Sequence, residues 1–178
     1  IAEKFKDAGY HTIGAVSVTH LSGKYGFAQG FENYSDTWGK NSGGSGEWER
    51  DAEKTTDATI EMIDNYVNNS DDVPLFLFLH YFDPHAPYLT RTSLVPSENI
   101  IRKYVNDYER EKVDSYDSEI RFVDTQIARL FSYLESKKLT DNFVFVITAD
   151  HGEQLGEHNY FGGHPDIYVE NVRVPLIF

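Results

Sequence analysis

Short runs of apolar residues alternate with stretches of helical periodicity along this chain of 178 residues. The runs HTIGAVSV (11–18), LFLFLH (75–80) and FVFVI (143–147) have the length and composition of strands. Strands that are apolar on both faces and alternate with helices are typical of a parallel sheet covered on both sides. We therefore predict an α/β fold in which a mainly parallel sheet is flanked by helices on both faces.

The helical stretches carry apolar residues at three- and four-residue spacing. Ile1, Phe5 and Ala8 share one face of a first helix, and Gly9 follows as a stop signal. A second helix is predicted over residues 51–67. We expect the longest stripe to pack against the sheet or another helix. Its members are Val113, Tyr116, Ile120, Val123, Ile127, Leu130 and Leu134.

Residues 19–50 form a predicted loop region between the first strand and the second helix. Their NSGGSGE stretch (41–47) is expected to be a flexible turn. The aromatic side chains of this region are expected to pack against the core. They are Tyr25, Phe27, Phe31, Tyr34 and Trp38.

The segment TADHGE (148–153) directly follows the predicted strand 143–147, which delivers Asp150 and His151 to the carboxyl end of a strand. Open α/β sheets carry their chemistry at this end. A carboxylate beside an imidazole suits a divalent metal, and Gly152 lets the backbone turn sharply next to them. The alternative is a turn capped by Asp150, with His151 as an ordinary loop residue.

A second polar segment, DPHAPY (83–88), follows the predicted strand 75–80. Pro84 and Pro87 restrict the backbone around His85 and so limit where its imidazole points. A fixed imidazole can donate a hydrogen bond to a sulfate or phosphate oxygen, and it can protonate a leaving alkoxide. The alternative is a surface histidine in a proline-rich loop.

Two neighbours of His85 have expected supporting roles. His80 ends the predicted strand, and we expect it to be a buried, hydrogen-bonded side chain near the site. Asp83 is a candidate for orienting a neighbouring histidine.

Three blocks of sequence, in this order, resemble the sulfatase family of the alkaline phosphatase superfamily. IAEKFKDAGYHTIGAVSV and GFAQGFENY (26–34) are similar to its upstream helix, strand and loop. FLFLHYFDPHAPY (76–88) is similar to its second active-site strand and loop. DHGEQLGEH, followed by GHPDIYVENVRVPLIF, is similar to its closing segments. The resemblance implies an alkaline phosphatase-like fold and the hydrolysis of sulfate esters.

The resemblance also implies roles for particular residues. Asp150 and His151 match the family's metal-ligating pair, and His85 matches its substrate-binding histidine. His164 stands four residues before Tyr168, where many sulfatases carry a lysine that neutralises the sulfate oxygens. His85 and His164 are therefore the predicted catalytic and substrate-binding residues, which stabilise the charge that grows as the ester bond breaks. Because the charge of a histidine depends on pH, a phosphate ester is also a credible substrate.

The remaining polar residues of the closing segments have lesser expected roles. His158 is a candidate for supporting His164. Glu153 and Glu157 either orient the metal ligands or are solvated. Glu170 and Arg173 are expected to be a structural pair or solvated charges.

Sulfatases also carry a C/S-x-P-x-R motif, whose first residue becomes the formylglycine nucleophile. This chain has no Cys and no S-x-P-x-R. We therefore expect residues 1–178 to be part of a single sulfatase-like catalytic domain, with the nucleophile outside this chain and the piece alone inactive. The resemblance implies Ca²⁺ as the metal, although an imidazole ligand also suits Mn²⁺ or Zn²⁺.

The composition limits the classes of partner. A net charge of −13 opposes binding to nucleic acid or to an anionic membrane. No apolar stretch approaches the ~20 residues of a membrane span, and no signal peptide is visible. The sequence thus predicts a soluble piece and indicates no compartment.

Three functions are compatible with these residues. The first is a sulfatase that acts on a small-molecule or glycan sulfate ester. The second is a phosphodiesterase, phosphomonoesterase or phosphotransferase of the same superfamily. The third is a non-catalytic metal-binding domain.

Overall fold

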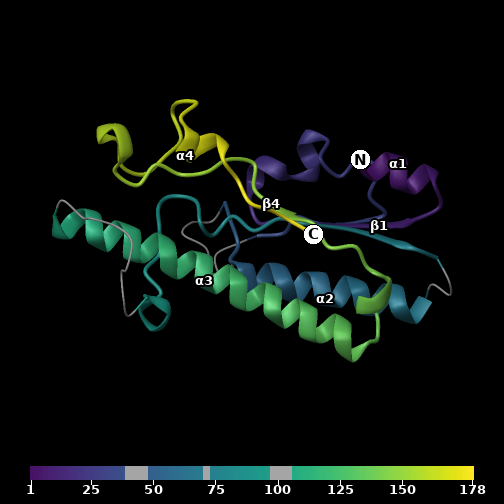
Figure 1. The fold of residues 1–178 in the computed structure, drawn as a ribbon. Helices are drawn as coiled ribbons and strands as arrows, with labels where there is room; N and C mark the ends of the chain where they lie inside the picture. Colours follow the sequence, from purple (N-terminus) through teal and green to yellow (C-terminus); the bar gives the residue numbers. More distant parts are fainter. Residues whose placement is uncertain (39–47, 70–72, 97–105) are drawn as a thin grey trace.

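The computed structural model describes four stretches of the chain, which are residues 1–38, 48–69, 73–96 and 106–178. The turn predicted at 41–47 lies outside the described residues. A parallel sheet in the order β2–β1–β3 lies at the centre of the fold (Figure 1). The predicted α/β class, with a parallel sheet and helices, is therefore confirmed.

The sheet is built on β1 (His11–Ala15), which pairs with β2 (Asn33–Ser35) and β3 (Leu75–Leu79). β1 is shorter than the predicted run 11–18, although Val16 and Val18 beyond it are also buried. The register places Gly14 opposite both Tyr34 and Phe78. A side chain at this glycine would collide with the Tyr34 ring, because a Cβ there would lie 2.6 Å from Cδ2.

Helices cover the sheet as the apolar spacing predicted. Figure 1 shows α2 (Ala52–Asn69) and α3 (Asp107–Ser136) side by side beneath it, with α1 (Ala2–Asp7) and α4 (Val169–Val172) above. All three predicted helices are present, and α3 begins six residues before the first position of its predicted stripe. None of the described helices combines the length and apolar character that a membrane span requires.

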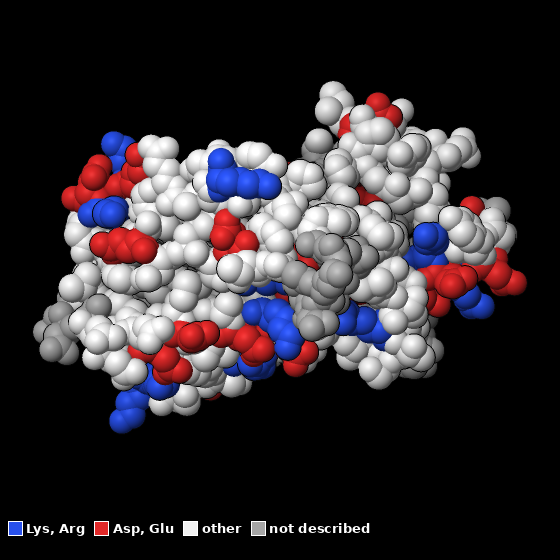
Figure 2. Space-filling view, turned by 180° about the vertical axis from the view of Figure 1, so that it is seen from behind, with Lys and Arg blue, Asp and Glu red and all other residues white. Residues whose placement is uncertain are grey.

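The core lies between the two long helices and the sheet. Ile63 of α2 packs with Leu130 and Leu134 of α3, and leucines of β3 pack against this cluster. Each of these large aliphatic side chains contributes about 1.5–3 kcal/mol when it is fully buried. At the surface, Lys137, which directly follows α3, pairs with Asp64 of α2 at 2.7 Å. Figure 2 shows acidic and basic side chains interspersed on the back of the molecule.

The first half of the predicted α3 stripe is only partly confirmed, since Val113 is buried but Ile120 is not. Ile120 is 43% exposed, whereas the polar residues Ser115, Ser118 and Glu119 are buried. The reason is that this half of α3 faces the polar loop after β3 and not the sheet. Thr90 Oγ1 and Ser115 Oγ, for example, lie 2.7 Å apart in a hydrogen bond.

The strand predicted at 143–147 is also mostly wrong. β4 covers only Ile147–Thr148 and pairs antiparallel with β5 (Leu176–Ile177). Phe145 packs on Phe131 of α3 with ring centroids 4.3 Å apart, while Val144 is 86% exposed. Among the described strands, β4 and β5 pair only with each other, and both residues of β5 are exposed.

The aromatic residues of the 19–38 region divide between core and surface. Phe31 lies near Phe76 and Phe78 of β3, with ring centroids 6.2 Å away in each case. Tyr25 and Phe27 are 63% and 49% exposed. The expected packing is confirmed for Phe31 and wrong for these two residues.

Candidate active site

Two segments of the chain converge above the N-terminal half of α3. In Figure 1 the teal chain that follows β3 lies between α3 and the yellow-green segment that precedes α4. A hydrogen bond joins these two segments, since the Tyr88 hydroxyl donates to a carboxylate oxygen of Glu153. Burial first, and then Glu153, raises the pKa of Tyr88, so this hydroxyl stays protonated and remains a donor.

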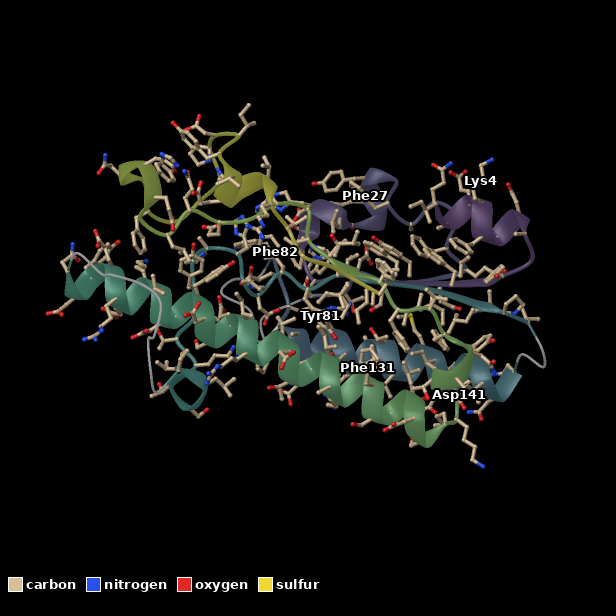
Figure 3. The ribbon with its side chains drawn as sticks, viewed as in Figure 1. Lys4, Phe27, Tyr81, Phe82, Phe131 and Asp141 are labelled. Atoms are coloured by element: carbon tan, nitrogen blue, oxygen red, sulfur yellow. The ribbon has the colours of Figure 1, made fainter. Side chains whose placement is uncertain are left out.

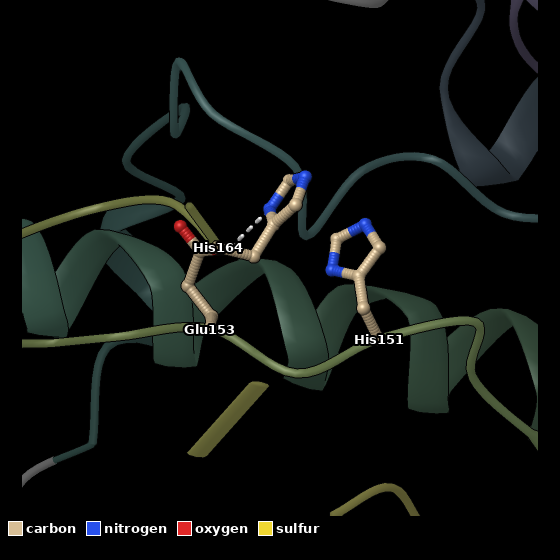
Figure 4. A group of neighbouring side chains, drawn as sticks. All are labelled: His151, Glu153 and His164. Atoms are coloured by element: carbon tan, nitrogen blue, oxygen red, sulfur yellow. Dashed lines mark ion pairs between the residues drawn. The ribbon is translucent and has the colours of Figure 1, made fainter. Parts of the chain in front are cut away.

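Histidines from both segments meet at this point. The ring centroids of His85 and His164 are 6.0 Å apart, and the rings meet edge to face. His151 and His164 are closer, with stacked rings whose centroids are 3.6 Å apart (Figure 4). The structure therefore brings together three of the four predicted site residues.

His151, Glu153 and His164 form the tightest group of possible metal ligands among the described residues. One ligand atom from each lies within 4.8 Å of the others. The Glu153 side chain is only 6% exposed, and its Oε2 is 3.7 Å from His164 Nδ1, the contact dashed in Figure 4. Two imidazoles and a carboxylate are a donor set that suits Zn²⁺ or Mn²⁺.

The backbone prepares His151 for such a role. Its Nδ1 lies 2.8 Å from the carbonyl oxygen of Gly152. Because a carbonyl only accepts, Nδ1 carries the proton, and the lone pair of Nε2 is available in the neutral ring. Metal-binding histidines are commonly held in this way by a backbone carbonyl.

Asp150 lies at the margin of this group. Its side chain is 83% exposed, and its Oδ2 is 3.8 Å from His151 Nε2. Its Oδ1 accepts a hydrogen bond from the backbone N–H of His151 at 3.1 Å. Ligation of a metal by Asp150 and His151 together stays a prediction.

Gly152 is required by close packing. Its N–H donates to the carbonyl oxygen of Asn171 at 2.7 Å. A Cβ on Gly152 would lie 1.9 Å from the carbonyl oxygen of Glu170. The absence of a side chain therefore lets the site segment lie directly against α4.

His85 is fixed from two sides. Its ring stacks on Phe82, which lies just beyond the end of β3 (Figure 3), with centroids 4.3 Å apart. Its Nδ1 is 2.6 Å from the carbonyl oxygen of Ala86, so Nδ1 carries the proton and Nε2 is the free nitrogen of the neutral ring. The stacking and the hydrogen bond together hold the imidazole in one orientation.

His80 is hydrogen-bonded, as expected, but only partly buried. The Ser17 hydroxyl donates to the His80 carbonyl oxygen at 2.9 Å and lies 3.3 Å from its Nδ1. Burial lowers the pKa of His80, and the nearby Asp150 partly opposes this shift.

The predictions of two supporting contacts are wrong. Asp83 orients no histidine, since its Oδ1 instead accepts from Ala52 N and Arg91 Nη2. His158 does not support His164, because its ring stacks on Tyr168, with centroids 3.7 Å apart. Its Nε2 lies 3.4 Å from Glu170 Oε2.

Glu153 and Tyr88 are the residues whose importance the sequence analysis underestimated. Glu153 was expected to orient ligands or to be solvated, yet it lies between the two segments. A usable signal was present in the sequence. In an extended segment alternate residues share a face, which puts Glu153 on the same side as His151.

Comparison with known proteins assigns this arrangement to a family. The sulfatase family model matches residues 1–178. The multifunctional alkaline phosphatase superfamily protein PehA of Trinickia caryophylli is 24% identical over an alignment of 222 positions, gaps included. The alignment covers 95% of this chain and 43% of that protein. Iduronate 2-sulfatase of Homo sapiens is 36% identical over 72 residues, which cover 40% of this chain and 13% of that protein.

A solved structure shows the same fold. The C-terminal periplasmic domain of EcEptC from Escherichia coli, in complex with Zn, matches with a TM-score of 0.75 at 16% identity. The match covers 98% of this chain and 50% of that chain. This chain spans half or less of the length of the relatives described here.

Proposed function

Because the chain belongs to the sulfatase family, we propose that its parent protein hydrolyses sulfate esters of a small molecule or glycan in a metal-dependent reaction. The observation that carries the proposal is the family match over the whole chain. The convergence of His85, His151 and His164 supports it, since these residues come from the two segments that resemble the family's site.

The residues present fit a divalent metal. His151 has an available Nε2, the buried Glu153 carboxylate supplies negative charge, and Asp150 lies beside them. When bound, the metal would polarise a sulfuryl oxygen and lower the pKa of the nucleophile. Ca²⁺ remains the ion that the family resemblance implies. The nitrogen donors of His151 and His164 favour Mn²⁺ or Zn²⁺.

The protein groups then have separate tasks. His85 has a free Nε2 beside the ring of His164, and in the protonated state it donates a hydrogen bond to a non-bridging oxygen. His164 binds a second such oxygen, and either imidazole can pass a proton to the leaving alkoxide. The nucleophile in this proposal is a formylglycine in another part of the parent protein. Residues 1–178 alone would then be inactive.

A phosphate ester is the second candidate substrate. The observation that favours it is His164, which replaces the lysine of many sulfatases and lies 3.7 Å from Glu153. The charge of a histidine depends on pH, unlike that of lysine, so His164 does not by itself favour a sulfate ester over a phosphate ester. Phosphoesterases of the superfamily would use a Ser or Thr nucleophile in place of formylglycine.

The test uses the full-length parent protein. Hydrolysis of 4-nitrophenyl sulfate and 4-nitrophenyl phosphate is measured, together with peptide mass spectrometry of the nucleophile segment. Formylglycine and preferred sulfate release would support the sulfatase proposal. An unmodified Ser or Thr with phosphate release would replace it by the second candidate. Metal binding without either activity would favour a non-catalytic domain.

A further inference from the structure

A buried cluster of charged side chains lies beneath the loop that carries His85, outside the group of possible metal ligands. It consists of Asp83 and Arg91, at the two ends of the loop, and Glu119 of α3. We propose that these three residues form a positioning network that holds the loop against α2 and α3 and so fixes His85. The inference rests on the proposed role of His85 in binding the ester.

Asp83 ties the start of the loop to α2. Its side chain is 2% exposed, and its Oδ1 accepts from the backbone N–H of Ala52 at 3.0 Å. Ala52 is the first residue of α2, where N–H groups have no partner within the helix. A carboxylate at this end is also favoured by the helix dipole. The contact therefore fixes the chain two residues before His85.

Arg91 closes the loop at its other end. Its Nη2 lies 3.2 Å from Asp83 Oδ1, so one carboxylate oxygen joins α2 to both ends of the loop. Its guanidinium carbon lies 3.5 Å from the centroid of the Phe122 ring on α3, and its backbone N–H donates to Ser118 Oγ at 3.0 Å. The ion pair and the ring contact use the guanidinium group, and the hydrogen bond uses the backbone N–H.

Glu119 supports the second half of the loop, at Leu89. Its side chain accepts a hydrogen bond from the backbone N–H of Leu89, and the residue is 2% exposed. Burial, opposed by this hydrogen bond, raises the pKa of Glu119 to about 8, and the charge of Asp83 adds to the rise. The carboxyl group is thus largely protonated at neutral pH, when it can also donate.

A small cavity connects the network to His85. Its volume is about 10 Å³, and its walls include Asp83, His85, Arg91 and Glu119. A space of this size admits roughly one water molecule and no ligand. His85 therefore lines the same small cavity as all three residues, and we expect a shift of the loop to move its imidazole.

The experiment is carried out on the full-length protein. It compares two substitutions of Glu119 with a control substitution at another buried polar position of α3. Glu119→Ala removes the acceptor for Leu89, and Glu119→Gln keeps an acceptor while it imitates the protonated acid. Gln126→Ala is the control. Gln126 is also buried on α3, but its side chain bonds to Arg129 on the same helix and not to the loop. Stability, ester hydrolysis and modification of His85 by diethyl pyrocarbonate are measured for each.

We expect Glu119→Ala to lower kcat by about 10- to 100-fold, because a small misplacement of a catalytic group has effects of this size. In this variant His85 should react faster with diethyl pyrocarbonate. Glu119→Gln and Gln126→Ala should leave both kcat and the reactivity of His85 close to their wild-type values. The proposal is overturned if Glu119→Ala lowers only the melting temperature, as the control does. The labelling needs no substrate. If the wild type hydrolyses no sulfate ester, the proposed function fails while the labelling still decides on the network.

Discussion

The imidazole of His151 is stacked on that of His164, with an angle of 27° between the planes and 3.6 Å between the centroids. The two residues are 13 positions apart in the sequence and flank a turn closed by the bridge between Leu155 and Phe161. The stack places two nitrogen donors beside the buried carboxylate of Glu153. A cation stabilises such an arrangement, because it offsets the carboxylate charge and uses both rings as ligands.

Glu153→Gln tests the charge at the centre of this group. The amide keeps an acceptor for the Tyr88 hydroxyl but loses the negative charge. We expect the affinity for Zn²⁺ or Mn²⁺ to fall by about 10- to 100-fold, measured by isothermal titration of the full-length protein. Glu157→Gln is the control, since Glu157 is exposed and accepts from Leu155 N in its own turn. Equal affinities in the two variants would remove Glu153 from the site.

Asp150→Ala tests the predicted metal pair. Loss of a ligand costs several kcal/mol of transition-state stabilisation, so we expect hydrolysis to fall at least about 100-fold, together with metal content. Asp166→Ala is the comparison, because Asp166 is exposed in the same segment and only its backbone carbonyl bonds to Asn171. If Asp150→Ala retained both activity and metal, the assignment of Asp150 would be wrong.

His164→Lys tests the departure from the lysine of many sulfatases. The permanent positive charge of the introduced lysine should raise the ratio of kcat/KM for sulfate esters to kcat/KM for phosphate esters. The expected increase is about tenfold if one charge-assisted contact of about 1.4 kcal/mol is gained. Metal content is measured in parallel, since a protonated lysine does not ligate. An unchanged ratio would exclude His164 from the ester site, and unchanged metal content would exclude it from the metal group.

The sequence predicted the elements whose packing is local and apolar. The helix over residues 51–67 and the strand over 75–80 follow directly from residue spacing, and both are present. The spacing of apolar residues did not predict burial correctly where the contacts with distant parts of the chain decide it. Ile120 is exposed because the loop after β3, and not the sheet, lies against that part of α3. Val144 is exposed because no described strand covers it.

The candidate site, like the fold, was predicted only in part. Motif resemblance identified His85, His151 and His164, which the structure brings together. It did not identify the partners that hold them, because those contacts join distant parts of the chain. Tyr88 and Glu153 are 65 positions apart, and Asp83 meets Ala52 across 31 positions.

The protonation of Glu119 makes stability depend on pH in a defined direction. Its pKa rises from 4.5 in the unfolded chain to about 8 when folded. The folded state therefore binds this proton more tightly, and stability is lost as the pH rises from about 4.5 to about 8. Asp83, whose pKa burial raises to about 6, acts the same way over a lower range. Arg91, Tyr88 and Glu49 are the other charged or titratable groups that influence Glu119.

Glu119→Gln removes the titrating proton and should stabilise the protein at alkaline pH. We expect its melting temperature to exceed that of the wild type by a margin that grows between about pH 4.5 and about pH 8 and then levels off. Thermal unfolding followed by circular dichroism at several pH values measures this difference. A constant difference across the range would show that Glu119 does not titrate there.

Gly152→Ala tests the contact that sets the site segment against α4. The added Cβ would lie 1.9 Å from the carbonyl oxygen of Glu170, which no side-chain rotation relieves because both atoms are tied to the backbone. The two segments must separate, which breaks the hydrogen bond from Gly152 N to Asn171 O and moves His151 and Glu153 away from His164. Overpacking of this kind costs about 1–3 kcal/mol, so we expect a lower melting temperature together with weaker metal binding. Ala149→Ser, at an exposed position in the same segment, should change neither quantity. If Gly152→Ala bound metal as tightly as Ala149→Ser, the close approach of α4 would not be what shapes the group of His151, Glu153 and His164.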